Sequence, residues 1–190
     1  MNALELHNVT KRFGEKVIAN DHVSLTVRRG EILAVLGENG SGKTTLMNMI
    51  AGIYHPDEGE IYVNGQPVTI SSPRDAFRCG IGMVHQHFML ARPMTVVENV
   101  MLGKKSRRGI LLDTKETATE LKELADKYKM NIDPYSKIWQ LSVGEQQRVE
   151  ILTAIYQGAD ILILDEPTAV LTPQEANILF DMLRHMKADG

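Results

Sequence analysis

A glycine-rich segment with one lysine carries the clearest chemistry in this chain. Residues 37–44 read Gly-Glu-Asn-Gly-Ser-Gly-Lys-Thr, which fits the pattern G-x-x-x-x-G-K-[ST] at every fixed position. Glycines let backbone N–H groups approach phosphate oxygens, and the N-terminus of a following helix adds partial positive charge. Lys43 would reach the β- and γ-phosphates of a nucleotide, and Thr44 would offer its hydroxyl to magnesium. A plain glycine turn is the alternative, and the complete match argues against it.

Two adjacent carboxylates form the second candidate for chemistry. Asp165 and Glu166 directly follow the apolar run Ile161–Leu164. Asp165 is placed to hold magnesium, directly or through water, and Glu166 would be the general base for an attacking water. Phosphoryl transfer asks the protein mainly to position groups and to neutralise charge, which this pair can do. A strand-ending Asp-Glu-Pro turn is the alternative, and it loses weight beside the phosphate loop upstream.

The phosphate loop needs a strand before it and a helix behind it. Ile32–Leu36 is a five-residue apolar run, as expected for a buried parallel strand. Behind the loop, apolar residues recur at helical spacing at Leu46, Met49 and Ile50. The apolar run Ile161–Leu164 would return the chain to the same core.

The N-terminal part predicts antiparallel strands beside this nucleotide layer. Residues 4–30 favour short strands, with a turn at Lys11–Gly14 between them. Ile61–Val63 followed by Asn64-Gly65 predicts a tight hairpin, because Asn-Gly supplies positive φ values. Ser72 would then cap a helix that begins at Pro73.

Helical patterns dominate from about residue 87 to residue 157. One apolar face there is formed by Ala118, Leu121, Leu124, Ala125 and Tyr128. A last helix carries a second apolar set, made of Ile178, Leu179, Met182, Leu183 and Met186. We therefore expect a helical subdomain inserted into an α/β core.

Residues 141–148 indicate which class of nucleotide-binding protein this chain resembles. They read Leu-Ser-Val-Gly-Glu-Gln-Gln-Arg and stand a short helix ahead of Asp165 and Glu166. This segment resembles the signature motif of ATP-binding cassette (ABC) ATPases, where the motif completes an ATP site belonging to another copy or half. The resemblance implies that Ser142 and Gly144 contact phosphate in trans. The resemblance therefore implies that this chain is half of a protein with two ATP sites.

Two further positions match that family. Gln86 resembles its Q-loop glutamine, which contacts magnesium and links to the membrane subunit, although a solvated loop glutamine is commonplace. Phe13 resembles the aromatic residue that stacks on adenine, and a buried turn aromatic is the competing interpretation. The resemblance then implies one set of nucleotide-binding residues, namely Phe13, Gly37, Glu38, Asn39, Gly40, Ser41, Gly42, Lys43, Thr44 and Thr45.

The chain departs from the family pattern in the signature and just after the carboxylates. The usual signature is Leu-Ser-Gly-Gly-Gln, and Val143 and Glu145 replace a Gly and the Gln here. Ser142 with Glu145 also makes a capping box, so Glu145 has a local structural role. Thr172 stands where the family usually has Asp, and it too predicts a helix N-cap, with Pro173 and Glu175 behind it.

Three phrases narrow the resemblance further. Residues 81–88, 141–150 and 167–175 look like the first half of bacterial tandem ATPases that serve import of simple sugars and nucleosides, with the nucleoside branch nearest. Two cassettes share one chain in such proteins. The family's switch histidine follows a strand after the last helix, and His185 is no substitute because it lies on the polar side of its helix. We therefore expect the chain to be a fragment of a longer protein.

Composition limits the alternatives. The chain has 190 residues, 43% of them apolar, and a net charge of −3, so the surface as a whole does not favour nucleic-acid binding. One cysteine, Cys79, excludes an internal disulfide and fits a reducing compartment. No apolar run approaches the roughly 20 residues of a membrane span. Any membrane connection would come through partners.

Two further segments give only weak indications of a binding site. His85 and His87 flank Gln86, but two histidines without a carboxylate or thiolate partner at ligand spacing make a poor metal site. The basic run Lys104–Arg108 could touch anionic lipid or nucleic acid, and a solvated charged loop is the better interpretation.

The sequence thus predicts a P-loop α/β fold with a mostly parallel core sheet, an N-terminal antiparallel β-subdomain and an inserted helical subdomain. The boundaries we expect are 1–86 for the nucleotide-binding core and β-subdomain, 87–157 for the helical subdomain and 158–190 for the return to the core. The predicted function is ATP hydrolysis with Mg²⁺, with Lys43, Gln86 and Glu166 as catalytic residues and Thr44, Gln86 and Asp165 at the metal.

The resemblance also implies partners and a location. Partners would be a second ATPase half, transmembrane permease subunits and, indirectly, a solute-binding protein, with no nucleic acid. The location would be peripheral, on the cytoplasmic face of the membrane. One rival is a soluble ABC ATPase acting on DNA or the ribosome; long coiled-coil insertions and zinc cysteines, which mark some of those relatives, do not occur here. The other rival is a regulatory half without turnover, against which Lys43, Asp165 and Glu166 argue.

Overall fold

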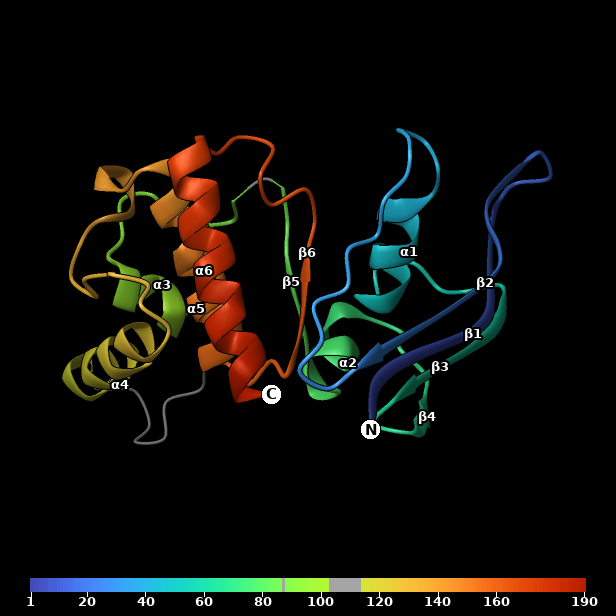
Figure 1. Ribbon diagram of the computed structural model, residues 1–190, viewed down its shortest axis with the longest axis horizontal. Helices are drawn as coiled ribbons and strands as arrows, with labels where there is room; N and C mark the ends of the chain where they lie inside the picture. Colours follow the sequence, from blue (N-terminus) through green and yellow to red (C-terminus); the bar gives the residue numbers. More distant parts are fainter. Residues whose placement is uncertain (87, 103–113) are drawn as a thin grey trace. The chain divides into compact units, whose positions relative to one another are not determined.

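Four strands form an antiparallel sheet near the N-terminus (Figure 1). Their order is β2-β1-β3-β4, with bounds β1 (Asn2–Phe13), β2 (Val17–Arg28), β3 (Glu58–Val63) and β4 (Gln66–Val68). Asn64 and Gly65, between β3 and β4, have φ values of 52° and 77°. The hairpin predicted from Asn-Gly is therefore confirmed, since a tight turn of this kind needs positive φ at both residues.

The structure is a computed structural model, which describes residues 1–86, 88–102 and 114–190. The chain divides into two compact units. The first contains Met1–Met83, Gly158–Asp165 and Lys187–Gly190, and the second contains Val84–Gln157 and Glu166–Met186. His87 and the basic run Lys104–Arg108 lie outside the described residues.

The first hairpin differs from the prediction. Pairing between β1 and β2 runs through Arg12↔Ile18 to Phe13↔Val17, so the strands are twelve residues each and the turn lies at 14–16. The predicted turn at Lys11–Gly14 was therefore wrong for its first three residues. Backbone pairing across the hairpin outweighed the local turn signals there, and several register shifts in β1 absorb the irregularity.

The core of the first unit lies between the antiparallel sheet and two helices. Helix α1 (Lys43–Ile50) buries Leu46, Met49 and Ile50, the three residues whose spacing predicted it. Helix α2 (Pro73–Arg78) begins as predicted, with Ser72 accepting a hydrogen bond from the Asp75 N–H and Pro73 in the first turn. The sheet contributes a matching apolar set to the same cluster, made of Leu4, Leu6, Val9, Ile61 and Val63.

A second, two-stranded sheet pairs β5 (Ile81–Val84) with β6 (Ile161–Leu164). The Gly80 carbonyl accepts hydrogen bonds from the N–H groups of Asp160 and Ile161, at 2.8 and 2.9 Å. The two strands therefore begin side by side and run parallel. Strand β6 lies where the apolar run 161–164 predicted it.

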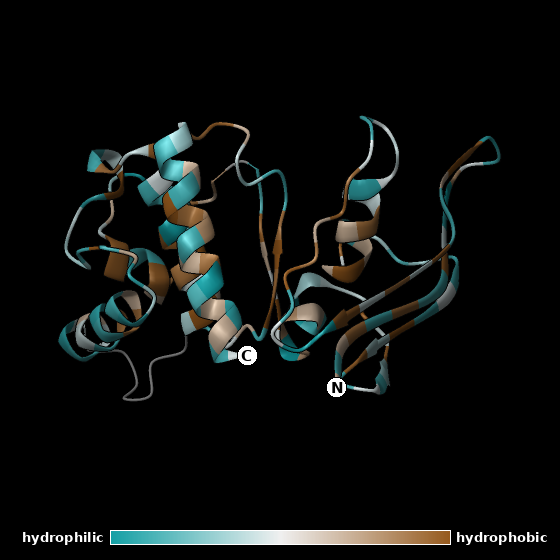
Figure 2. Ribbon diagram, in the orientation of Figure 1, coloured by the Kyte–Doolittle hydropathy of each residue, from teal (hydrophilic) through white to brown (hydrophobic). Residues whose placement is uncertain are grey.

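The strand predicted at Ile32–Leu36 does not form, so this prediction was wrong. Residues 31–38 have no strand assignment, and Ile32, Leu33 and Leu36 are 51%, 40% and 89% exposed. Figure 2 shows this hydrophobic run between β2 and α1. A strand forms by pairing, and no strand among the described residues pairs with this segment, so its apolar side chains stay exposed.

The second unit is helical. Its elements are α3 (Val96–Met101), α4 (Thr114–Lys127), the short 3₁₀ helix η1 (Ile138–Gln140), α5 (Val143–Tyr156) and most of α6 (Pro173–Asp189). The predicted apolar face of α4 is confirmed, because Ala118, Leu121 and Ala125 are fully buried. In α6, Leu179 and Met182 are buried, whereas Ile178 stays 44% exposed.

A buried arginine ties α5 to the loop after α4. The Nε of Arg148 donates to the Met130 carbonyl at 3.0 Å. Burial lowers the pKa of this guanidinium from its usual value. None of the helices in the described ranges has both the length and the apolarity to cross a membrane.

Candidate nucleotide site

The glycine-rich loop meets helix α1 in a conformation that only glycine adopts easily. Gly40 and Gly42 have φ values of 83° and 88°, and Gly42 is the N-cap of α1. A Cβ on Gly42 would lie 2.1 Å from the Ala19 carbonyl oxygen and 2.9 Å from the Asn20 Nδ2. The Asn20 amide also donates to the Gly42 carbonyl at 3.3 Å. Strand β2 therefore packs directly against the point where the loop becomes a helix.

The loop curls around the ammonium group of Lys43. Its Nζ donates to the carbonyl oxygens of Gly37 and Glu38, at 2.7 and 2.8 Å, and lies 3.5 Å from the Ser41 Oγ. The surrounding loop from Gly37 to Ser41 is exposed. A half-buried cation inside an exposed ring of backbone, at the N-terminus of a helix, is a suitable arrangement for binding phosphate.

The aromatic candidate Phe13 lies at the end of β1, in the same unit as the loop. Its side chain is 41% exposed, which counts against the buried-aromatic alternative. The Tyr54 ring, just after α1, meets it edge-on with centroids 5.3 Å apart. Phe13 pairs with Val17, three residues before the strand position that contacts Gly42. Phe13 is thus partly exposed at the end of the hairpin whose other strand packs on the phosphate loop.

The metal candidates offer the right kind of atom. Asp165 is half-buried immediately after β6, and Thr44 is exposed in the first turn of α1. Carboxylate and hydroxyl oxygens are ligands that Mg²⁺ accepts, and Mg²⁺ usually completes its shell with substrate phosphates and water. In the described part of the chain, no group of three His, Cys, Asp or Glu side chains could hold a metal by itself. The donor set therefore fits an ion that arrives with a nucleotide.

The structure brings Gln86 and Glu166 together across 80 residues of sequence. The Gln86 Nε2 donates to the Glu166 Oε2 at 3.2 Å. Glu166 has a φ of 46°, in the left-handed region that few non-glycine residues occupy. Such backbone strain is concentrated at functional sites. The general-base candidate is thus held by the predicted glutamine in an unusual conformation.

The signature segment caps helix α5. Ser142 is the N-cap, and the reciprocal bonds with Glu145 form the predicted capping box. The Ser142 hydroxyl and the Gly144 N–H also donate to one oxygen of Glu175, at 3.1 and 3.3 Å. The donors predicted to face phosphate are therefore occupied by a carboxylate of the same chain.

Glu175 is strongly bound at its other oxygen as well. The backbone N–H and the hydroxyl of Thr172 donate to it at 3.0 and 2.9 Å, which confirms the cap predicted at Thr172. These donors lower the pKa of the Glu175 carboxyl, the Thr172 N–H having the largest effect and Ser142 and Gly144 smaller ones. The carboxylate is thus firmly ionised at neutral pH.

Sequence reasoning missed three contacts. Asn20 holds the Gly42 carbonyl, Asp57 binds the backbone beside Phe13 at 2.6 Å, and Glu175 reaches the signature donors. The capping pattern at Thr172 marked Glu175 but not its second role. No local pattern marked Asn20 or Asp57, because their partners are distant in sequence.

A sequence profile described as ABC transporter matches residues 20–169, well over half of the chain. The match covers the phosphate loop, the signature and both carboxylates. The chain belongs to the ABC transporter family. Within that family, it is 50% identical over 187 residues to the nucleoside import ATP-binding protein NupA of Lactococcus lactis and 49% identical to the guanosine import ATP-binding protein NupO of Bacillus subtilis. These alignments cover 98% of this chain but only 37% and 36% of the relatives, so the chain spans little more than a third of their length.

Solved structures of ABC transporter cassettes share the fold. One is the ADP conformation of MJ1267, an ATP-binding cassette of an ABC transporter, with a TM-score of 0.87 and 29% identity. Another is a nucleotide-free ATP-binding cassette from an ABC transporter, with a TM-score of 0.85 and 29% identity. They cover all of this chain, which in turn covers 78% and 79% of theirs. The predicted P-loop ABC fold is confirmed.

Proposed function

We propose that this chain is the nucleotide-binding cassette of an importer, and that it binds and hydrolyses ATP to drive uptake of a nucleoside or simple sugar. The observation that carries the proposal is the phosphate loop, which wraps the Lys43 ammonium at the start of α1 in a chain of the ABC transporter family. The two relatives named above are import ATP-binding proteins for nucleosides, which supports that class of solute.

The residues of this chain divide the work of phosphoryl transfer. Lys43 and the backbone N–H groups of residues 37–45 hold the β- and γ-phosphates. Phe13 stacks on the adenine. Thr44, Gln86 and Asp165 would hold magnesium, which would neutralise phosphate charge. Glu166, held by the Gln86 amide at 3.2 Å, orients the attacking water and takes its proton.

Transport also needs other parts of the importer. A second ATPase half supplies the opposite signature, while Ser142 and Gly144 of this chain serve the site of that half. Permease subunits provide the membrane path and a solute-binding protein delivers the solute, which places the cassette peripherally at the cytoplasmic face. The length of the relatives supports this arrangement, since they extend far beyond the part that this chain matches.

Titration of the chain with ATP tests the proposal. Lys43→Ala should weaken ATP binding by at least about 30-fold, roughly 2 kcal/mol, because a charge-assisted contact to phosphate is lost. Lys115→Ala is the matched control, since Lys115 is an exposed lysine of α4. Affinity that is unchanged within about twofold in the Lys43 variant would exclude the phosphate loop as the nucleotide site.

A further inference from the structure

The end of β1 is paired on one side only. Pairing between β1 and β3 stops at Thr10↔Glu58, whereas pairing between β1 and β2 continues to Phe13↔Val17. The last three residues of β1 therefore face the start of β3 without a partner strand. A strand end of this kind is free to fray unless another group binds its backbone.

Asp57, the residue before β3, takes the place of that missing partner. Its Oδ2 accepts the Arg12 N–H at 2.6 Å, and its own N–H donates to the Thr10 carbonyl at 2.8 Å. Its Oδ1 accepts from the Lys11 ammonium at 2.9 Å. The Arg12 N–H, and after it Lys11, lower the pKa of the Asp57 carboxyl, which keeps it ionised. One carboxylate thus continues the ladder with its side chain.

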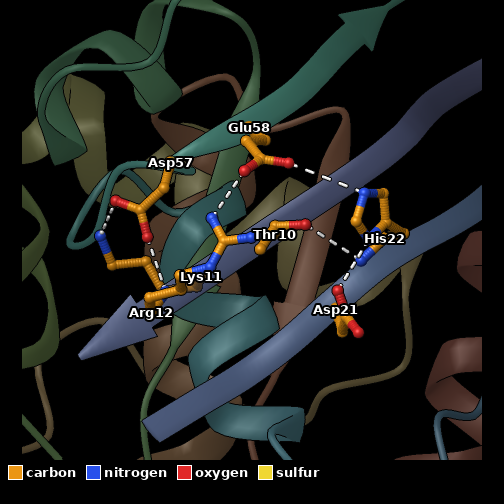
Figure 3. Close-up of polar contacts among 7 residues, drawn as sticks. All are labelled: Thr10, Lys11, Arg12, Asp21, His22, Asp57 and Glu58. Carbon is orange, nitrogen blue, oxygen red and sulfur yellow. Dashed lines mark hydrogen bonds and ion pairs between the residues drawn. The ribbon is translucent and has the colours of Figure 1, made fainter. Parts of the chain in front are cut away.

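Neighbouring ion pairs hold the same strand end, as Figure 3 shows. The Arg12 guanidinium donates to Glu58 at 2.6 Å, and the Nε2 of His22 lies 3.6 Å from the other Glu58 oxygen. The His22 N–H donates to the hydroxyl of the buried Thr10 at 3.0 Å. Side chains near the end of β1 therefore bond to both β2 and β3.

The strand end that Asp57 bonds finishes at Phe13, the residue after Arg12. The Lys11 ammonium that Asp57 binds lies 5.8 Å from the centre of the Phe13 ring. The Tyr54 ring also contacts Phe13, with the two ring planes at 79°. Asp57 is therefore connected to Phe13 in two ways, through the backbone of the adjacent Arg12 and through the Lys11 ammonium.

We propose that Asp57 is a positioning residue for Phe13, which fixes the aromatic ring where the base of a bound nucleotide can stack on it. The inference rests on the proposed function, because it assumes that the phosphates lie in the loop around Lys43 and that the base reaches Phe13. The hydrogen bonds of Asp57 go to Thr10, Lys11 and Arg12, none of which belongs to the phosphate loop. Asp57 should therefore affect the contribution of the base to nucleotide affinity and leave the contribution of the phosphates unchanged.

Parallel titrations with ATP and with inorganic tripolyphosphate separate these parts, because tripolyphosphate has the phosphates without a base. Asp57→Ala should weaken ATP binding about fivefold, a part of what aromatic stacking on a base contributes, and leave tripolyphosphate binding unchanged within about twofold. Phe13→Ala should reduce ATP affinity at least as much. Adding Asp57→Ala to Phe13→Ala should change ATP affinity by less than about twofold, since residues that act through one contact are not additive.

Glu60→Ala is the matched control, because Glu60 is a carboxylate of β3 that bonds the Tyr62 hydroxyl. It should leave both affinities unchanged. Unchanged ATP affinity in Asp57→Ala, an equal loss for ATP and tripolyphosphate, or full additivity with Phe13→Ala would each overturn the inference. Failure of the proposed function gives a different result, in which Lys43→Ala changes neither affinity.

Discussion

The phosphate loop and the signature segment are both predicted to face phosphate, and they satisfy their polar groups in opposite ways. In the loop, the Lys43 ammonium bonds the neutral carbonyls of Gly37 and Glu38. In the signature, the Ser142 hydroxyl and the Gly144 N–H bond the carboxylate of Glu175. An anion that enters the loop competes only with dipoles, whereas an anion that approaches the signature meets a negative charge. The loop is thus prepared to bind phosphate, and the signature must first release its own carboxylate.

The two segments also differ in what surrounds their central glycines. Around Gly42 the atom nearest to an added Cβ is backbone, the Ala19 carbonyl oxygen at 2.1 Å, and the Asn20 side-chain Nδ2 follows at 2.9 Å. Around Gly144 the nearest atoms belong to the Glu175 side chain, at 2.8 to 3.0 Å. Backbone cannot give way cheaply, but the end of a glutamate side chain can. Gly42 is thus enclosed by backbone of β2, whereas Gly144 is covered by a side chain.

The largest effect should come from Gly42→Ala. The alanine would adopt a φ of 88° and press its Cβ against strand β2, so we expect the free energy of unfolding to fall by about 2–3 kcal/mol. ATP affinity should fall at least about tenfold, because the start of α1 must shift. Urea unfolding and ATP titration measure both quantities.

Gly65→Ala is the control for that experiment. Gly65 has a φ of 77°, but no atom lies within 4 Å of an added Cβ. The free energy of unfolding should fall by only about 1 kcal/mol, the strain of an alanine in the left-handed conformation, and ATP affinity should not change. If Gly42→Ala behaved like Gly65→Ala, strand β2 would not constrain the loop.

A smaller effect is expected from Glu175→Gln, which tests the charge that covers the signature. Glutamine can still cap α6 through Thr172, since either Glu or Gln serves in a capping box. The neutral amide would no longer repel an incoming phosphate. In the protein that contains both ATPase halves, the ATP concentration giving half-maximal hydrolysis should fall about threefold, roughly 0.6 kcal/mol for a partly exposed charge.

Phosphate release against ATP concentration measures this effect. Glu123→Gln is the matched control, because Glu123 is an exposed carboxylate of α4. An unchanged or raised half-maximal concentration in Glu175→Gln, with Glu123→Gln equal to wild type, would mean that the carboxylate does not compete with phosphate at the signature.

The sequence predicted those parts of both segments that depend on near neighbours. The helix behind the loop and the cap at Ser142 are local properties of a few residues, and both are confirmed. The strand at Ile32–Leu36 was wrong because a strand depends on a partner elsewhere in the chain. The turn at Lys11–Gly14 was wrong in part for the same reason, since pairing with β2 continues to Phe13.

The distant contacts of the two segments could not be predicted. Glu175 lies 31 residues after Gly144, and Asp57 lies 45 residues after Arg12. Each is an ordinary acidic residue beside a turn or cap, and only the folded chain shows which donors it meets. The family resemblance named residues expected to face the nucleotide, and the structure added one carboxylate that bonds the signature donors and another that bonds the backbone next to Phe13.

The smallest effect should come from Gly144→Ala, the counterpart of Gly42→Ala in the signature. Gly144 lies in the first turn of α5 and is not among the residues with positive φ. Alanine there gains helix propensity of up to about 1 kcal/mol, and its Cβ meets only side-chain atoms of Glu175. The two changes oppose each other, so the free energy of unfolding should stay within about 1 kcal/mol of wild type. The Gly144 N–H remains in place, and ATP affinity at the loop around Lys43 should not change. Urea unfolding and ATP titration of Gly144→Ala beside Gly42→Ala give the comparison directly. A loss in Gly144→Ala as large as that in Gly42→Ala would show that Glu175 is as immovable as backbone, and that the signature is enclosed as rigidly as the loop.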